Sequence, residues 1–272
     1  MTARAFSRTS RTACTVRTVA AALAATGLLS GAVACGSDDG DGGSSTGAAG
    51  GDSSTASESA PSAASGKPTD LMLQKADAPA GYGWNNVADV FDEDDDSVSD
   101  FMSQLRETGG DTVDPAECSG IVPDENALLL ELHDHPDTTA VTEFLPHDDN
   151  DRTVIDGMVS TAHDAADQVP DDLSRCATFT RTSSLDPSKP PVTYHAQATD
   201  GAVVGAQDVH VITVVEEDPA SPDNASDPVL IVTGTADGVF FRVSAVGLKE
   251  PQILLDLADR QVARITGQPA TK

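Results

Sequence analysis

The feature that most restricts the fold of this chain is an abrupt change of composition at Cys35. The run "AALAATGLLSGAVA" before it is apolar and rich in alanine, and the only charges in front of this cysteine are four arginines. From Gly36 to Gly66 the chain has no Val, Ile, Leu, Met or aromatic residue. Such a segment cannot bury enough apolar surface to offset the entropy of ordering. We therefore predict a disordered Gly/Ser/Asp linker over residues 35–66 and a folded domain over residues 67–272.

Residues 1–34 have the plan of an export signal, with a basic segment, an apolar segment and small residues before a cleavage site. The apolar run is too short and too rich in alanine for a membrane-spanning helix. Val33 and Ala34, directly before Cys35, resemble the lipobox of bacterial lipoproteins. This resemblance implies cleavage before Cys35 and a diacylglyceryl group on its sulfur, with acyl chains such as palmitate that anchor the protein to the outer face of the cell membrane. The alternative is an ordinary signal peptidase site at Ala32-Val33-Ala34, which leaves Cys35 as a free thiol.

The four cysteines of the chain are expected to have three different fates. Cys14 leaves with the predicted signal, and Cys118 and Cys176 remain as a pair in an oxidising compartment. Pairing them closes a loop that stabilises the fold by about 4 kcal/mol if the effect is chain entropy. A zinc site is the alternative, but neither cysteine has further thiol or imidazole ligands at short spacing. We predict a single disulfide between Cys118 and Cys176, and lipidation then accounts for the odd cysteine, Cys35.

The charge of the chain restricts its partners. The chain carries 16 basic and 44 acidic residues, and removing the signal with its four arginines leaves 12 and 44, about −32 with neutral histidines. This charge disfavours nucleic acid and anionic lipid headgroups as partners of the domain. Contact with the bilayer is therefore expected through the acyl anchor on Cys35, with the linker holding the domain away from the membrane.

The first half of the predicted domain contains helical patterns. Asp70 is expected to cap a short helix, and residues 95–110 are expected to form a longer one that ends at two glycines. The run "ENALLLELHDH", residues 125–135, is ambiguous between helix and strand. Residues 151–176 predict a strand that passes into a helix around Ser160.

The second half contains strand patterns. Five runs are rich in β-branched residues: "CATFTRTS", "PVTYHAQAT", "AVVGAQDVHVITVVEE", "PVLIVTGT" and "VFFRVSAV". Asp200-Gly201 and Asp237-Gly238 each join two of these runs and favour tight hairpins, so the neighbouring strands are expected to be antiparallel. A final helix is predicted between Pro251 and Gly267, with an i,i+4 pair of Asp256 and Arg260. Its apolar face contains Leu254, Leu257, Ala258, Val262 and Ile265.

The strand runs carry apolar residues on both alternating sets, so both faces of the sheet need cover. The final helix is expected to cover one face. The N-terminal helices either cover the other face completely or leave a cleft that accepts a lipid-like or other amphiphilic envelope molecule. An acidic rim would disfavour anionic headgroups there. The predicted fold class is therefore α+β, a largely antiparallel twisted sheet flanked by helices with a single disulfide.

The domain resembles the PknH-like extracellular sensor domain, which occurs in actinobacterial lipoproteins and outside a mycobacterial receptor kinase. The resemblance covers most of residues 70–266 and rests on an ordered set: "DLMLQKADAPAGYGW", "DPAEC", "RCATF", the strands "DVHVITVVEE", "PVLIVTGT" and "VFFRVSAV", and the final amphipathic helix. The family commonly has further cysteines, and this chain has one pair. The resemblance implies a helix-flanked antiparallel sheet with a cleft that senses or binds an envelope ligand, and it brings no catalytic residues.

The predicted domain, residues 67–272, contains no nucleophile elbow, Walker loop or His-Glu-x-x-His motif. His133 and His135 would share one face of a strand and could bind a metal with Asp148 or Asp149, but solvated histidines in an Asp-rich protein are the simpler interpretation. The acidic run Phe91–Asp100 lacks the spacing of an EF-hand and is interpreted as a solvated face or helix start.

We therefore expect a non-enzymatic ligand-binding or sensor domain on the extracytoplasmic face of the cell membrane, without cofactor or metal. Its expected partner is an envelope small molecule, lipid or protein. The alternatives are a cell-envelope hydrolase with an unrecognised site and a structural assembly partner. A hydrolase would show a histidine hydrogen-bonded to a Ser or Asp inside a cleft, and an assembly partner would show an exposed apolar patch.

Overall fold

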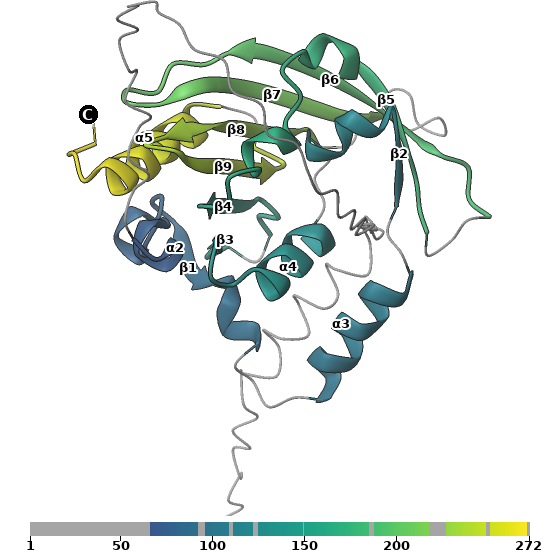
Figure 1. The fold of residues 1–272 in the computed structure, drawn as a ribbon, viewed down its shortest axis with the longest axis horizontal. Coiled ribbons are helices and arrows are strands. Elements are labelled where there is room, and N and C mark those ends of the chain that lie inside the picture. Colours follow the sequence, from purple (N-terminus) through teal and green to yellow (C-terminus); the bar gives the residue numbers. More distant parts are fainter. Residues whose placement is uncertain are drawn as a thin grey trace, which may run out of the picture.

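The computed structural model describes residues 66–91, 96–108, 111–121, 125–148, 150–184, 188–217, 227–248 and 251–270. The predicted signal, Cys35, the linker and the glycine pair Gly109-Gly110 lie outside these residues. The described residues confirm the predicted α+β fold, because one large antiparallel sheet carries helices on both of its faces (Figure 1).

The sheet has nine strands in the order β1-β3-β4-β9-β8-β7-β6-β5-β2, and every neighbouring pair is antiparallel. The last five strands in the chain are the five predicted from their β-branched runs. The strand bounds are β1 (Tyr82–Asn86), β2 (Thr112–Asp114), β3 (Thr139–Pro146), β4 (Val154–Ser160), β5 (Thr178–Thr182), β6 (Val192–Asp200), β7 (Gln207–Glu217), β8 (Val229–Ala236) and β9 (Val239–Val246).

The two longest helices among the described residues are α3 (Asp96–Thr108), which packs on α4 (Glu125–Asp134), and α5 (Gln252–Thr266), which packs on β8 and β9. A further α-helix is α2 (Pro68–Leu71). The 3-10 helices are η1 (Lys75–Asp77), η2 (Val87–Phe91), η3 (Ala116–Ile121), η4 (Ala166–Gln168) and η5 (Leu173–Cys176). The ambiguous run at residues 125–135 is thus a helix.

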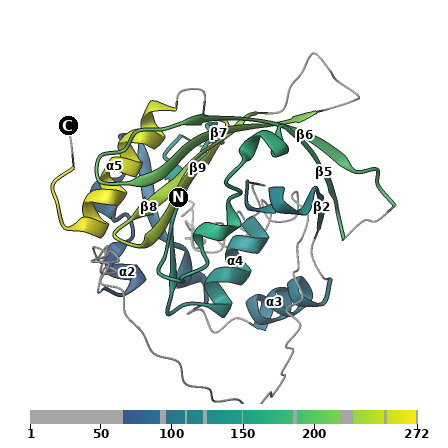
Figure 2. The same ribbon diagram turned by 45° about the horizontal axis from the view of Figure 1, so that its top comes forward.

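One face of the sheet, here called the first face, is covered by α5 and α2 (Figure 2). All five residues of the predicted apolar face of α5 are buried there. They pack on Leu230 and Val232 of β8 and on Phe241 and Val243 of β9. Gln261 of α5 is fully buried and fixes the helix to the segment after α2, because its Oε1 accepts from the backbone N–H of Leu73 at 3.2 Å and its Nε2 donates to the carbonyl of Leu71 at 2.6 Å.

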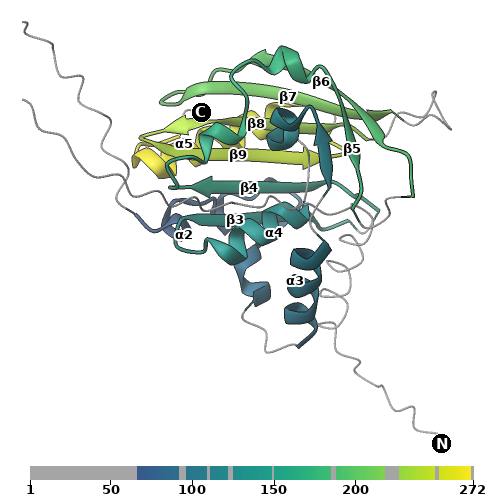
Figure 3. The same ribbon diagram turned by 45° about the vertical axis from the view of Figure 1, so that its right-hand side comes forward.

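The opposite face, the second face, is covered by the N-terminal half of the domain (Figure 3). Helix α4 buries Leu132 against β3, β4 and β9. The helices η3 and η5 pack a second cluster, with Cys118 and Cys176, against strands β5 to β8. Both alternating sets of side chains on β8 include buried residues, as the two-sided apolar pattern predicted, but on β9 the set toward the second face is buried only at Phe240, and Val246 is exposed.

The tight hairpin at Asp237-Gly238 is confirmed. The two residues join β8 directly to β9, and their φ angles of 47° and 76° are both positive, as a type I′ turn requires. The prediction of a tight hairpin at Asp200-Gly201 is wrong. β6 and β7 are antiparallel neighbours, but residues 201–206 form a longer connection between them.

Three other local predictions are wrong. Asp70 is not an N-cap, because α2 begins at Pro68 and Asp70 lies inside it. The chain after Ser160 forms the 3-10 helices η4 and η5 and no α-helix, because Pro170 interrupts the segment and the polar residues around it have no apolar periodicity to bury. The predicted pair of Asp256 and Arg260 is replaced by two other contacts: Asp256 accepts from Gln252 at 2.8 Å within α5, and Arg260 makes a tertiary contact by donating to the carbonyl of Asp77 at 2.7 Å.

Candidate functional site

A cleft of about 490 Å³ lies on the second face, where the ends of β7, β8 and β9 meet the segment 166–171. Val169 of this segment packs against both clusters that cover the second face, so the cleft lies where the two clusters meet. Its volume falls within the range of about 300–1,000 Å³ that is usual for small-molecule sites. The cover of the second face is thus incomplete at this point.

The floor of the cleft is formed by two neighbouring strands. Thr233 and Thr235 of β8 and Phe240 of β9 line it, and Thr235 pairs with Phe240 across the two strands. Thr233 is 1% and Phe240 is 5% exposed. The Thr233 hydroxyl donates to the carbonyl of Phe241 at 3.1 Å. The floor is therefore neutral, with an aromatic ring beside satisfied hydroxyl groups.

One side of the cleft is shaped by a β-bulge in β7. Gln207 pairs with Thr235 and His210 pairs with Thr233, so β7 has one more residue than β8 between these pairs. The bulge contains Asp208, whose φ of 51° lies in the left-handed region. Bulges re-aim side chains at the ends of strands. Here the bulge places an exposed carboxylate and a half-buried imidazole at the cleft.

The rim of the cleft is acidic. Asp167 and Asp171 of the segment 166–171 and Asp208 of β7 line it, and all three are exposed. The described residues that line the cleft include no Lys or Arg. Among the described residues, no ion pair neutralises any of these three carboxylates. The potential at the cleft is therefore negative.

The wall that carries Asp167 and Asp171 is fixed by η3. Gly120 of η3 lies so close to the backbone of Gln168 that a Cβ at this position would be 1.7 Å from the Gln168 carbonyl oxygen. Only glycine allows this approach. Arg242 of β9 donates to the Gly120 carbonyl at 3.3 Å, which ties η3 to the sheet.

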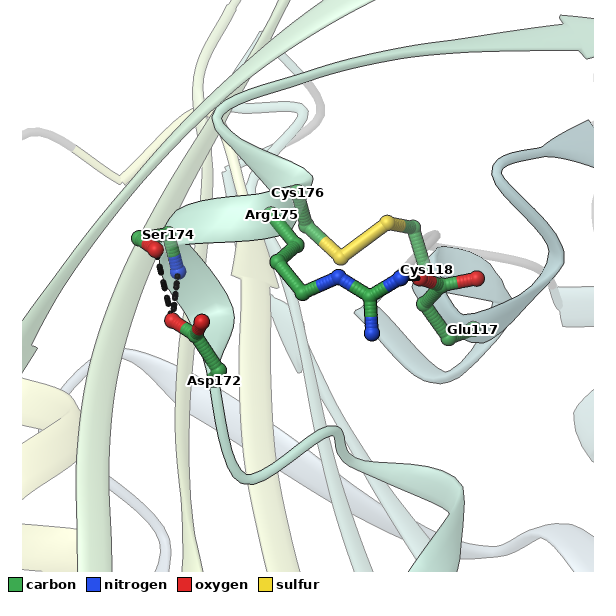
Figure 4. Close-up of a disulfide and its surroundings, with 6 residues drawn as sticks. All are labelled: Glu117, Cys118, Asp172, Ser174, Arg175 and Cys176. Atoms are coloured by element: carbon green, nitrogen blue, oxygen red, sulfur yellow. Dashed lines mark hydrogen bonds and ion pairs between the residues drawn. A yellow bond between two sulfur atoms is a disulfide. The ribbon is translucent and has the colours of Figure 1, made fainter.

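The predicted disulfide is present, and it joins η3 to η5 (Figure 4). Cys118 and Cys176 are both fully buried, so the zinc alternative is wrong for this pair. Around it, Arg175 pairs with Glu117 at 2.5 Å. Asp172 accepts from the hydroxyl of Ser174 at 2.6 Å and from its backbone N–H at 3.1 Å, and these hydrogen bonds lower the pKa of Asp172. The disulfide thus joins η5, which follows the cleft wall in the sequence, to η3, which packs against that wall.

The predicted histidine site is not assembled. His133 lies on α4 and not on a strand, and Arg106 of α3 donates to its Nδ1 at 2.8 Å. The ring of His133 makes an edge contact with Phe91 at a centroid distance of 5.1 Å. Within the described residues no group of three or more His, Cys, Asp or Glu side chains is arranged to hold a metal ion. Asp149, one of the two carboxylates considered for this site, lies outside the described residues.

The carboxylates and the histidine of the cleft were missed by the sequence analysis. Asp167 and Asp171 fell within a segment predicted to be helical, and Asp208 and His210 fell within a predicted strand. Phe240 lies in a run whose two-sided apolar pattern indicated only that both faces of the sheet need cover.

No helix among the described residues is long and apolar enough to cross a membrane. Comparison of the chain with protein-family models gives no match, and comparison with curated proteins gives none.

Proposed function

We propose that this protein is a lipid-anchored lipoprotein whose domain binds a ligand on the extracytoplasmic face of the cell membrane. The observation that carries the binding function is the cleft of about 490 Å³ over the second face. Small-molecule sites are concave and combine apolar surface with polar groups that fix the orientation of the ligand, and this cleft joins Phe240, Val169 and Pro170 to six polar residues. The resemblance of the sequence to extracellular sensor domains also supports a role in binding an envelope ligand.

The anchoring part of the proposal rests on the sequence. The small residues before Cys35 match the lipobox pattern, and residues 36–66 have the composition of a flexible tether with a root-mean-square reach of about 30 Å. A domain with a large negative charge is repelled by anionic headgroups, so a tether that separates it from the bilayer suits its surface. The partners we propose are the bilayer, through the acyl groups, and an envelope molecule in the cleft.

We propose binding and not hydrolysis for the cleft. Catalysis by a serine or carboxylate requires a base within hydrogen-bond reach of it. His210 is the histidine at the cleft, whereas the described histidine that contacts both a hydroxyl and a carboxylate is His195, which is exposed and lies outside the cleft lining. The neutral floor and the charged rim instead offer packing and electrostatic recognition. The assembly alternative requires an exposed apolar patch. In the described part of the chain the exposed large hydrophobic side chains are Val204 and Val246, and two side chains offer little apolar surface for a partner.

The proposal is tested by filling the cleft. Thr235 is half-buried in the floor, and Thr235→Trp would occupy the space beside Phe240. We expect the wild-type protein, extracted from its own membranes, to carry a bound small molecule that native mass spectrometry detects as an added mass. The Thr235→Trp variant should lose this added mass.

The matched control is Thr199→Trp on β6. Thr199 is exposed and lies outside the cleft lining, and its hydroxyl donates to the Val211 carbonyl at 3.5 Å, as that of Thr235 does to the Gln207 carbonyl at 3.5 Å. The control variant should keep the added mass. An unchanged adduct in both variants would show that the ligand binds elsewhere, and a wild-type protein without any adduct would contradict the proposed function.

A further inference from the structure

We propose that the cleft selects a small organic cation, a protonated amine or quaternary ammonium group that carries an apolar substituent. This inference rests on the proposed binding function and adds the chemical class of the ligand. It follows from the combination of an open cleft of about 490 Å³, a neutral floor with an aromatic ring, and a rim that is lined by carboxylates.

The rim of the cleft indicates the sign of the charge on the ligand. Asp167, Asp171 and Asp208 come from two segments far apart in sequence and meet at one opening. The described residues supply no Lys or Arg to the lining itself, and Arg242, which donates to the Gly120 carbonyl beside the cleft wall, is not part of that lining. A cleft lined by one sign of charge over low-dielectric walls concentrates the field at its mouth. A cation in the opening would be attracted by all three carboxylates, and an anion would be repelled by all three.

The floor of the cleft indicates that the ligand also carries an apolar substituent. Phe240 is almost completely buried, and Val169 and Pro170 line the opposite wall. An apolar substituent would be removed from water between these side chains, while its charged group remains near the exposed carboxylates. The volume of about 490 Å³ accommodates a molecule larger than an inorganic ion.

A metal ion is the competing cation, and the geometry disfavours it. Calcium and magnesium require several oxygen ligands at about 2.0–2.6 Å around one point. No group of three or more His, Cys, Asp or Glu side chains in the described part of the chain is arranged in this way. The rim carboxylates are distributed over two walls of the cleft. Such an arrangement suits a charge that is attached to a larger organic group.

The test uses three probes of the same shape and different charge with the full chain: benzyltrimethylammonium, benzyl alcohol and phenylmethanesulfonate. Dissociation constants are measured by nuclear magnetic resonance titration. The cation should bind at least about tenfold more tightly than the anion, since about 1.4 kcal/mol of difference in binding free energy suffices for a factor of ten. Raising the salt concentration should weaken the binding of the cation, because the rim is exposed to solvent.

A variant with a neutral rim distinguishes attraction of the cation by the cleft from attraction by the net negative charge of the whole protein. In the triple variant Asp167→Asn, Asp171→Asn and Asp208→Asn, the affinity for the cation should fall about tenfold while that for the alcohol stays the same. Asparagine tolerates the left-handed φ at position 208, so the bulge is retained. The control variant Asp70→Asn, Glu107→Gln and Asp256→Asn removes the same charge from exposed residues outside the cleft lining and should leave all affinities unchanged.

The outcomes distinguish the two proposals. If the alcohol, cation and anion bind equally well, or if both triple variants weaken the cation equally, the inference of cation selectivity is wrong while binding in the cleft stands. If no probe of any charge perturbs Phe240 or Thr235, the inference is wrong, while the proposed function is contradicted only if the wild-type protein also carries no added mass.

Discussion

Replacing Cys118 and Cys176 together by alanine is expected to lower the free energy of unfolding by about 4 kcal/mol. The cross-link joins residues separated by 58 positions, and its removal restores the entropy of that loop to the unfolded chain. Alanine avoids placing two unsatisfied hydroxyl groups at positions that are fully buried. The measurement is urea denaturation of the purified protein followed by circular dichroism.

The control for this result is the wild-type protein unfolded in urea with a thiol reductant. It should unfold at the same urea concentration as the double variant, and the reductant should not alter the variant. A loss of less than about 1 kcal/mol in the double variant would show that packing of η3 and η5 alone holds these helices in place, contrary to the role given to the disulfide.

Replacing Cys35 by alanine is expected to move the protein from the membrane fraction to the medium. The predicted anchor consists of acyl chains attached at this sulfur, and each buried CH2 group of such a chain contributes about 0.8 kcal/mol of membrane binding. The acidic domain itself is repelled by an anionic membrane surface. The measurement is fractionation of cells followed by immunoblotting of membranes and medium.

Cys14→Ala serves as the matched control, because Cys14 lies in the segment that the predicted cleavage removes. This variant should stay in the membrane fraction. Retention of the Cys35→Ala variant in membranes, or release of both variants, would rule out a lipid anchor at Cys35.

The second half of the domain was predictable because its patterns are local and repeated. The β-branched runs locate β5 to β9, and Asp237-Gly238 specifies the one tight turn between them. The apolar positions of α5 lie on one face at helical spacing, and all are buried on the sheet. The two-sided apolar pattern of β8 and β9 predicted cover on both faces, which α5 and the N-terminal helices provide.

The errors have a common physical cause, which is that tertiary contacts decide between weak local preferences. Arg260 donates to the Asp77 carbonyl in preference to Asp256 four positions away on its own helix. The segment after Ser160 was predicted to be helical, but its place is set by the close approach of Gln168 to Gly120, which lies far away in the sequence. A sequence pattern does not contain this contact.

The cleft itself was anticipated only as one of two ways to cover the second face. Its residues come from a 3-10 segment, a bulge and two strand ends, and no periodicity connects them. The bulge at Asp208 depends on a mismatch in register between β7 and β8, which appears only when the strands are paired. The negative charge of the rim was predictable from the composition, because acidic residues far outnumber basic ones in the chain.

The central claim is that the cleft between β8 and residues 166–171 is the ligand site. The most direct test is a crystal structure of the protein purified from its own membranes, without added ligand. We predict electron density for a bound molecule against Phe240 and Thr235, with its polar end toward Asp167, Asp171 and Asp208. A bound molecule at another place, or a cleft that contains only ordered solvent, would contradict the account.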